Sequence, residues 1–363
     1  MDQSLDLFVL SSDNADSALA LARRGPDIAI SRMHLNAPEI QRFIDFTEEI
    51  EQAAQGRTTR PTQAQLDDIG RKLFEHVFQG DVLRLYRRSP PGLISIQIVT
   101  DHQSIQRMPW EFINPDDKVP VPHQDRCVVR ILPMCVDSDP KPASRLKSVR
   151  VLLVGAEPVN EPGVGWSAVE KDLRRTFQSV DGVGTLQVVA GADRTSLLDA
   201  LNSKRFDVFH FLGHGTVVDG EGYLALVDID AGTSELISSR DLATALSGSG
   251  LKLAILSACE TGVGSIAQGF GSVAHALLQA GVPAVVANQT SIPTNSIVPF
   301  VSALYRRLVR DGNIDSAVMA GRAALNIDLR PGVDKNLAVF EWGIPSLYRW
   351  PGAAQLFVEG DPT

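Results

Sequence analysis

Two stretches of the sequence, DVFHFLGHG at residues 207–215 and LKLAILSACETG at residues 251–262, decide the fold. Each stretch opens with a continuous apolar run, from Asp207 to Leu212 in one and from Leu251 to Ser257 in the other. A short apolar run bounded by turn residues is typical of a strand that is buried on both faces of a sheet. We therefore expect two buried strands, each ending in a loop with unusual residues.

The sequence around these two runs alternates apolar runs with amphipathic stretches. Further strands are expected at Val149–Val154, Leu186–Ala190, Gly222–Val227 and Pro283–Ala287, and helices at Trp166–Val180, Thr195–Asn202, Thr294–Arg310 and Ile314–Ile327. Strands that alternate with helices indicate an α/β fold with a mainly parallel sheet flanked by helices. In such sheets, functional sites form beyond the carboxyl ends of the strands.

The first 147 residues follow a different pattern, in which short apolar patches are separated by polar stretches. Strands are expected at Leu5–Leu10, Asp27–Arg32, Leu93–Val99 and Cys127–Leu132, and a helix at Thr62–Phe78. Residues 136–147 are polar, contain two prolines and have no periodicity, which favours a linker. We predict an N-terminal accessory lobe at residues 1–147 and a second domain at residues 148–363.

Length and composition agree with two folded domains. The chain has 363 residues, and domains average about 150 residues. Its 44% apolar and 21% charged residues are close to the globular average, which excludes a mainly disordered or fibrous chain. Lys and Arg number 34 against 43 Asp and Glu, so the net charge is −9. A general phosphate-binding surface is disfavoured, and no direct contact with nucleic acid is expected.

The cysteine count points to a reducing compartment. Three cysteines, Cys127, Cys135 and Cys259, are too few for a disulfide framework. The acidic N-terminus lacks the basic start and apolar core of a signal peptide. No apolar run reaches the roughly 18 residues that a membrane span needs. We therefore expect a soluble, cytoplasmic protein without contact to a membrane.

The two runs end in side chains that together suit nucleophilic catalysis. His214 lies between Gly213 and Gly215, and Cys259 precedes a glycine-rich turn. If the two strands are neighbours, His214 and Cys259 face each other across the carboxyl ends. A thiol is only partly ionised at neutral pH, and a nearby imidazole can take its proton and later protonate a leaving amine. The N–H groups of Gly215 and Cys259 are candidates for an oxyanion hole.

These residues also resemble a known family. The motifs HFLGHG at 210–215, LSACETG at 256–262 and GFGSVAHALLQAGVPAVV at 269–286 together resemble a CHAT domain, a caspase-like cysteine protease of clan CD related to separases. Upstream, MPWEF at 108–112 resembles the Pro-Trp-Glu segment that often precedes this protease core. The His–Cys spacing of 259 − 214 = 45 residues is close to the spacing of about 50 in caspases.

The resemblance implies roles for individual residues. Cys259 would be the nucleophile, His214 the general base and acid, and Gly215 an oxyanion donor, with no third triad member evident. It further implies an N-terminal lobe that is accessory or a degenerate caspase-like domain. Relatives often work in bacterial antiviral defence or programmed cell death, where a sensor protein switches them on and they cut a partner protein. A protein substrate and an activating protein partner are therefore expected.

Substrate preference does not carry over from the resemblance. Many relatives have Ser-Leu-Trp after the Val-Val strand, where this chain has ANQTS at 287–291. The candidate pocket residues are Asp228, Glu260, Asn288 and Gln289. Asp228 lies in an acidic segment with Asp219, Glu221 and Asp230. In basic-specific relatives, an acid in this region binds the Arg or Lys side chain of the substrate. The same acids can equally be solvated turn residues.

Other interpretations of these motifs remain open. A folded CHAT module that acts as a sensor or scaffold without turnover would carry the same residues. A nucleotide site at Gly262–Gly271 lacks the P-loop and dinucleotide signatures. A zinc site of His210, His214 and Cys259 lacks the closely paired ligands typical of zinc, so we expect no metal and no cofactor. We interpret His210 as a hydrogen-bonded core residue, and Trp110 with Glu111 as structural.

Overall fold

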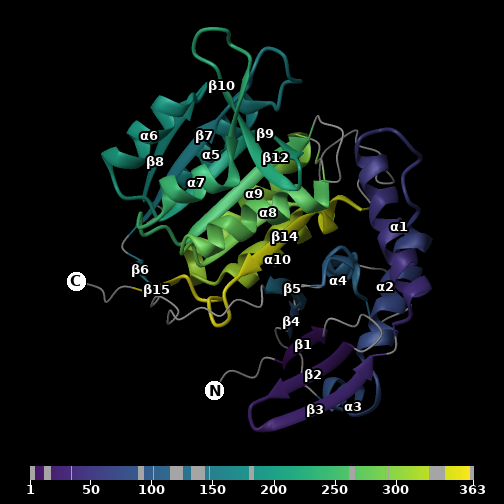
Figure 1. Ribbon diagram of the computed structural model, residues 1–363. Coiled ribbons are helices and arrows are strands. Elements are labelled where there is room, and N and C mark those ends of the chain that lie inside the picture. The colour runs from purple at the N-terminus through teal and green to yellow at the C-terminus, as the bar shows by residue number, and fades with distance from the viewer. Residues whose placement is uncertain are drawn as a thin grey trace. The chain divides into compact units, whose positions relative to one another are not determined.

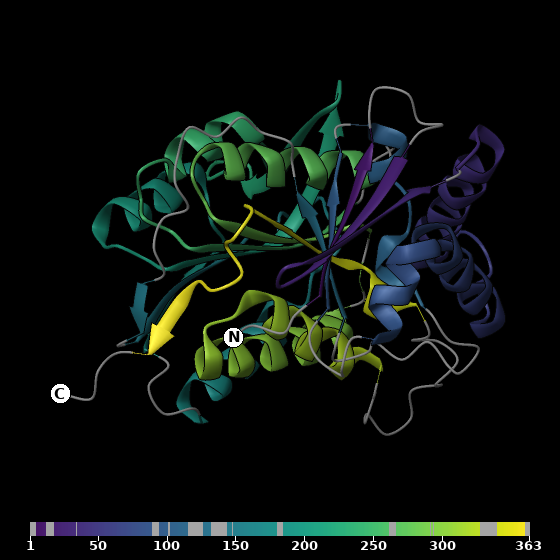
Figure 2. The same ribbon diagram turned by 90° about the horizontal axis from the view of Figure 1, so that it is seen from below.

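The computed structural model describes most of the chain. The described residues are 5–11, 18–33, 35–88, 94–100, 102–114, 126–131, 144–146, 148–179, 184–260, 266–290, 292, 294–326 and 340–359. They form two compact units, shown in Figures 1 and 2. The first unit comprises Met1–Val136 with Val318–Ser346, and the second comprises Asp137–Ala317 with Leu347–Thr363. The domain boundary after residue 147 stays a prediction.

The second unit is built on a parallel sheet in the order β8-β7-β9-β12-β13. The strands are β7 (Val149–Gly155), β8 (Gly184–Ala190), β9 (Val208–Val218), β12 (Leu253–Glu260) and β13 (Ala284–Asn288). Two antiparallel strands, β10 (Glu221–Val227) and β11 (Ser234–Ser238), continue from the carboxyl-terminal half of β9. The prediction of a mainly parallel sheet flanked by helices is confirmed.

Helices cover both faces of this sheet. They are α5 (Trp166–Ser179), α6 (Arg194–Ser203), α7 (Ser239–Leu246), α8 (Ile266–Gln279) and α9 (Thr294–Asp311), and α10 (Ile314–Asn326) follows. Figure 2 shows α8, in green, on one side of the sheet and α9, in yellow-green, on the other. Because both faces are covered, Phe209 and Phe211 of β9 are fully buried, as the continuous apolar runs predicted.

The two decisive strands extend further than the sequence predicted. His214 and Gly215 belong to β9, and Cys259 belongs to β12, whereas we expected all three in loops. The reason is pairing: residues 214–218 of β9 find an antiparallel partner in β10, and β12 continues along β9 up to Glu260. Backbone hydrogen bonding therefore holds these residues on regular strands.

In the first unit, hydrogen-bonded strands follow the order β5-β4-β1-β2-β3, with mixed strand directions. Its strands are β1 (Leu5–Ser11), β2 (Ala18–Arg24), β3 (Asp27–Met33), β4 (Ile94–Val99) and β5 (Arg126–Ile131). Its helices are α1 (Ala37–Ala54), α2 (Gln63–Val77), α3 (Gly80–Arg88) and α4 (Gln103–Gln106), with short 3₁₀ turns at Trp110–Phe112 and Glu341–Gly343. β1, β4 and β5 are parallel, and β2 and β3 add antiparallel hairpins.

Three further strands belong to the described part of the chain. β14 (Pro345–Arg349) follows the second 3₁₀ turn, and β6 (Ser144–Leu146) pairs with β15 (Phe357–Glu359). β6 occupies part of the predicted linker, whose residues 136–143 and 147 lie outside the described residues. Across the described ranges, no helix is long and apolar enough to cross a membrane.

Candidate active site

β9 and β12 bring the two candidate catalytic residues to the same level of the sheet. The strands pair in parallel, and His214 is the register partner of Cys259. The next pair along is Gly215 with Glu260. The condition set in the sequence analysis, that the two strands are neighbours, is met. Because parallel strands end at the same edge, this register places both residues at the carboxyl edge, where α/β proteins form their sites.

A backbone carbonyl orients His214. Its Nε2 lies 2.7 Å from the carbonyl oxygen of Pro162, and the residue is only 2% exposed. A carbonyl oxygen can only accept, so Nε2 carries the proton and donates it. In the neutral imidazole, Nδ1 is then the basic nitrogen. No residue type in the sequence indicates this partner, because every residue carries a backbone carbonyl oxygen.

The loop that carries Pro162 is held at both ends. Glu157 Oε1 accepts hydrogen bonds from the backbone N–H of Val164 at 3.0 Å and of Trp166 at 3.3 Å. The second of these bonds satisfies an N–H at the start of α5. Val159 N–H donates to the Gly232 carbonyl in the β10–β11 turn at 3.0 Å. The loop therefore has a defined conformation around the carbonyl that meets His214.

His210 lies four residues before His214 on β9 and is fully buried in the core. Its Nδ1 is 3.2 Å from the Tyr305 hydroxyl and its Nε2 is 3.2 Å from Ser257 Oγ. Burial lowers the pKa of His210 to about 3, so the ring is neutral in the physiological range. The interpretation as a hydrogen-bonded core histidine is confirmed. Since both ring nitrogens are engaged, His210 offers none to a zinc ion.

The remaining predicted site residues occupy three places. Asp228 accepts hydrogen bonds from the N–H groups of Asp230 at 2.9 Å and Ala231 at 2.7 Å, and so organises the β10–β11 turn. Asn288 ends β13 and is 5% exposed, with Gln289 directly after it. Glu260 ends β12. Cys135 and residues 261–265 of the predicted turn lie outside the described residues.

An open groove of about 610 Å³ lies between α7 and α8, beside the β9–β10 turn. Its lining combines acidic, basic and small residues, among them Asp219, Glu221, Arg240, Ser272 and His275. Within the described part of the chain, no group of three or more His, Cys, Asp or Glu side chains could hold a metal ion.

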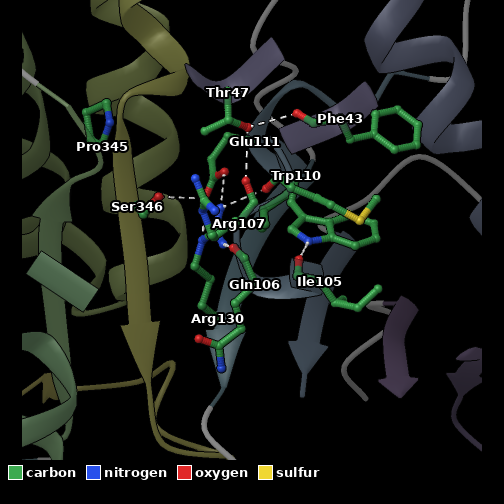
Figure 3. Close-up of polar contacts among 12 residues, drawn as sticks. Phe43, Thr47, Ile105, Gln106, Arg107, Trp110, Glu111, Arg130, Pro345 and Ser346 are labelled. Atoms are coloured by element: carbon green, nitrogen blue, oxygen red, sulfur yellow. Dashed lines mark hydrogen bonds and ion pairs between the residues drawn. The ribbon is translucent and has the colours of Figure 1, made fainter. Parts of the chain in front are cut away.

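In the first unit, Trp110 and Glu111 form a buried structural cluster, drawn in Figure 3. The Trp110 indole donates to the Ile105 carbonyl at 2.7 Å. Glu111 pairs with Arg130 at 2.7 Å and accepts from Ser346 Oγ at 2.6 Å. Burial alone would raise the pKa of Glu111, but the charges and hydrogen bonds of its neighbours hold it below its ordinary value. The structural interpretation of both residues is confirmed.

Solved structures with the same architecture define the fold class. The chain is similar to Saccharomyces cerevisiae separase in two crystal structures of the separase–securin complex. At 3.0 Å resolution the match has a TM-score of 0.52 and 12% identity, and at 2.6 Å a TM-score of 0.49 and 11% identity. Each match covers 96% of this chain and 30% of that chain. The match with a TM-score of 0.52 shows that this chain has a caspase-like fold, as separase does.

The family follows from a direct match of the sequence. The model of the CHAT domain matches residues 67–345, more than half of the chain, and this protein belongs to the CHAT domain family. A comparison with curated proteins found no match. The chain spans about 30% of the separase length, so activities of the whole separase molecule do not transfer by similarity.

Proposed function

We propose that this protein is a cysteine endopeptidase in which Cys259 is the nucleophile and His214 the general base and acid. The observation that carries the proposal is the register of His214 with Cys259 on neighbouring parallel strands, at the edge where such folds form their sites. The contact of His214 Nε2 with the Pro162 carbonyl supports it, because it leaves Nδ1 free of its proton in the neutral ring.

The proposed reaction has two halves. His214 Nδ1 takes the thiol proton, the Cys259 sulfur attacks the peptide carbonyl, and the N–H groups of Gly215 and Cys259 hold the resulting oxyanion. The same imidazole then gives its proton to the leaving amine, which departs and leaves an acyl-enzyme. A water molecule deprotonated by Nδ1 hydrolyses the thioester and releases the free thiol.

The substrate class is a protein. The proposed substrate-binding residues are Asp228, Glu260, Asn288 and Gln289. The family resemblance favours a regulated defence or cell-death system in the cytoplasm. A separate protein partner would switch the enzyme on. Securin is the partner in the two separase complexes, and it is a protein.

The burial of His214 favours a second candidate function. At 2% exposure, the imidazole has little access to a substrate in this conformation. A CHAT module that works as a sensor or scaffold without turnover needs no access to the imidazole, so it accounts for that burial directly. Under the first candidate, the same burial means that activation has to open the site.

Labelling with a peptidyl acyloxymethyl ketone distinguishes the candidates. We expect intact-mass analysis to find one adduct on wild type and none on Cys259→Ala. The matched control is Cys127→Ala, which removes a fully buried thiol and keeps the adduct. Equal labelling of wild type and Cys259→Ala would contradict the nucleophile assignment. No labelling of any form, together with no partner cleaved during co-expression with genomic neighbours, would favour the non-catalytic module.

A further inference from the structure

Three polar side chains from three elements of the second unit meet in its core. Tyr305 comes from α9, His210 from β9 and Ser257 from β12. They form a chain of two hydrogen bonds, both 3.2 Å long, with the imidazole in the middle. Their exposures are 1%, 0% and 5%, so no substrate reaches them.

In this chain of hydrogen bonds, the donor and the acceptor of each bond are defined. Burial raises the pKa of Tyr305, so its hydroxyl stays protonated and needs an acceptor. Among the described residues His210 Nδ1 is its hydrogen-bond partner, and the proton is satisfied when Tyr305 donates to it. Nε2 then carries the imidazole proton and donates to Ser257 Oγ. Each partner therefore restricts the orientation of the next.

Apolar side chains could fill the same space. Hydrogen bonds in the core largely replace those lost to water, so exchanging both partners for apolar groups of the same shape can be nearly neutral in stability. What hydrogen bonds add is direction, because they weaken steeply when the donor and acceptor move out of line. The two hydrogen bonds therefore restrict the relative positions of α9, β9 and β12 more than apolar packing would.

The hydrogen bond between His210 and Ser257 connects the two strands just before the candidate catalytic positions. His210 precedes His214 by four residues, and Ser257 precedes Cys259 by two. Positions two or four apart in a strand belong to the same face. The bond from His210 to Ser257 thus joins, one step deeper in the sheet, the same two strands whose register brings His214 opposite Cys259.

We propose that Tyr305, His210 and Ser257 form a positioning chain, which fixes β9 against β12 so that His214 meets Cys259 in a reactive geometry. The inference rests on the proposed peptidase function and adds three residues to it. None of the three touches the substrate. Their effect passes through the strands to the imidazole and the thiol.

Alkylation of Cys259 by iodoacetamide between pH 5.5 and 9.5 tests the inference without a substrate. Trypsin cleaves after Arg126, Arg130 and Lys252, so each cysteine falls on its own peptide and mass spectrometry follows Cys259 alone. For wild type we expect a midpoint below about 8.5, the value of an ordinary thiol. His214→Asn should move the midpoint up to that value, which tests the proposed function itself.

Tyr305→Phe and Ser257→Ala then test the positioning chain. We expect each to raise the midpoint by about one unit, which lowers the thiolate fraction at pH 7 about tenfold. The matched control is Ser302→Ala, which removes a buried hydroxyl of the same helix that bonds to Thr176 and Asp172 on α5. That variant should keep the wild-type midpoint. Because Tyr305 and Ser257 are the two end members of the positioning chain, the test stays valid if one of the two variants fails to fold.

The possible outcomes separate the two proposals. If His214→Asn leaves the profile unchanged, the activated thiol and hence the proposed function are contradicted. If His214→Asn shifts the midpoint but Tyr305→Phe and Ser257→Ala do not, only the positioning chain is overturned. A shift in Ser302→Ala as large as in the other two variants would also overturn it, because general loosening of α9 would then explain the effect.

Discussion

At the scale of single residues, two histidines four residues apart on β9 illustrate how surroundings assign different tasks to one side-chain type. His214 places its Nε2 on the Pro162 carbonyl, so Nδ1 is the basic nitrogen of the neutral ring. His210 has both nitrogens engaged in the core. The sequence predicted different roles, because His214 stands between glycines and His210 between two phenylalanines; the core role of His210 is confirmed, and the catalytic role of His214 stays a prediction. Their partners could not be predicted, since Tyr305 lies 95 residues away and Pro162 contributes only its backbone.

His210 makes stability depend on pH. Its pKa of about 3 in the folded protein is below the ordinary 6.5, so the unfolded chain binds more protons between these values. Stability is therefore highest above pH 6.5 and falls as the pH drops toward 3. At pH 5 the loss from this group is about 2 kcal/mol. In urea unfolding at pH 8 and pH 5, His210→Gln should lose about 2 kcal/mol less than wild type, and an identical loss in both would refute this.

Glu111 balances buried positive charge. Its carboxylate pairs with Arg130, and the buried Arg322 lies 4.0 Å away. Glu111→Ala would leave both guanidinium groups without that carboxylate, and we expect it to lower the free energy of unfolding by about 3–5 kcal/mol. The control Arg174→Ala breaks an exposed pair with Glu170 and should cost less than about 1 kcal/mol. Similar costs for the two variants in urea unfolding would contradict the expectation.

At the scale of elements, the sequence predicted what periodicity and apolar runs encode. Strands β7, β9, β12 and β13 and helices α5, α9 and α10 lie where we expected them. We missed α1, although its signals are present: Asn36 caps it, Pro38 stands in its first turn and Glu39 completes a capping box. The strand extensions around His214 and Cys259 could not be predicted, because they depend on pairing with β10 and with each other.

The loop of residues 156–165 is the element that should control His214. Glu157→Ala removes the acceptor for two backbone N–H groups, so the loop no longer holds the Pro162 carbonyl in a fixed position. We therefore expect ketone labelling of Cys259 to slow by roughly tenfold or more. Stability should fall by about 1 kcal/mol, as for a lost helix cap. Asp193→Ala removes the cap of α6 and should cost the same stability. If both variants slow labelling equally, the loop has no special role.

At the scale of the whole molecule, order along the chain and order in space differ. Residues 318–346 return to the first unit after the second unit has formed most of its sheet. The CHAT match at residues 67–345 likewise includes parts of both units. Sequence analysis placed one boundary near residue 147, because a linear reading of composition detects a polar stretch but not a segment that returns.

The returning segment predicts how a truncated chain behaves. A fragment of residues 148–363 would retain Arg322 and Ser346 but lose Glu111, their partner within the first unit. We expect this fragment to be aggregated or to lack a cooperative thermal transition by circular dichroism, whereas the full chain unfolds cooperatively. A fragment that unfolds as sharply as the full chain would support an independent domain from residue 148 onward.

The hydrogen bond from His214 to Pro162 has a consequence for how such centres evolve. Every residue type carries the same carbonyl oxygen, so a substitution at position 162 changes a side chain without deleting the atom that orients the imidazole. Mutation can therefore move the loop but cannot remove the group. Position 162 can therefore vary within the backbone shape of the loop, whereas position 157 cannot, because the Glu157 carboxylate holds that shape.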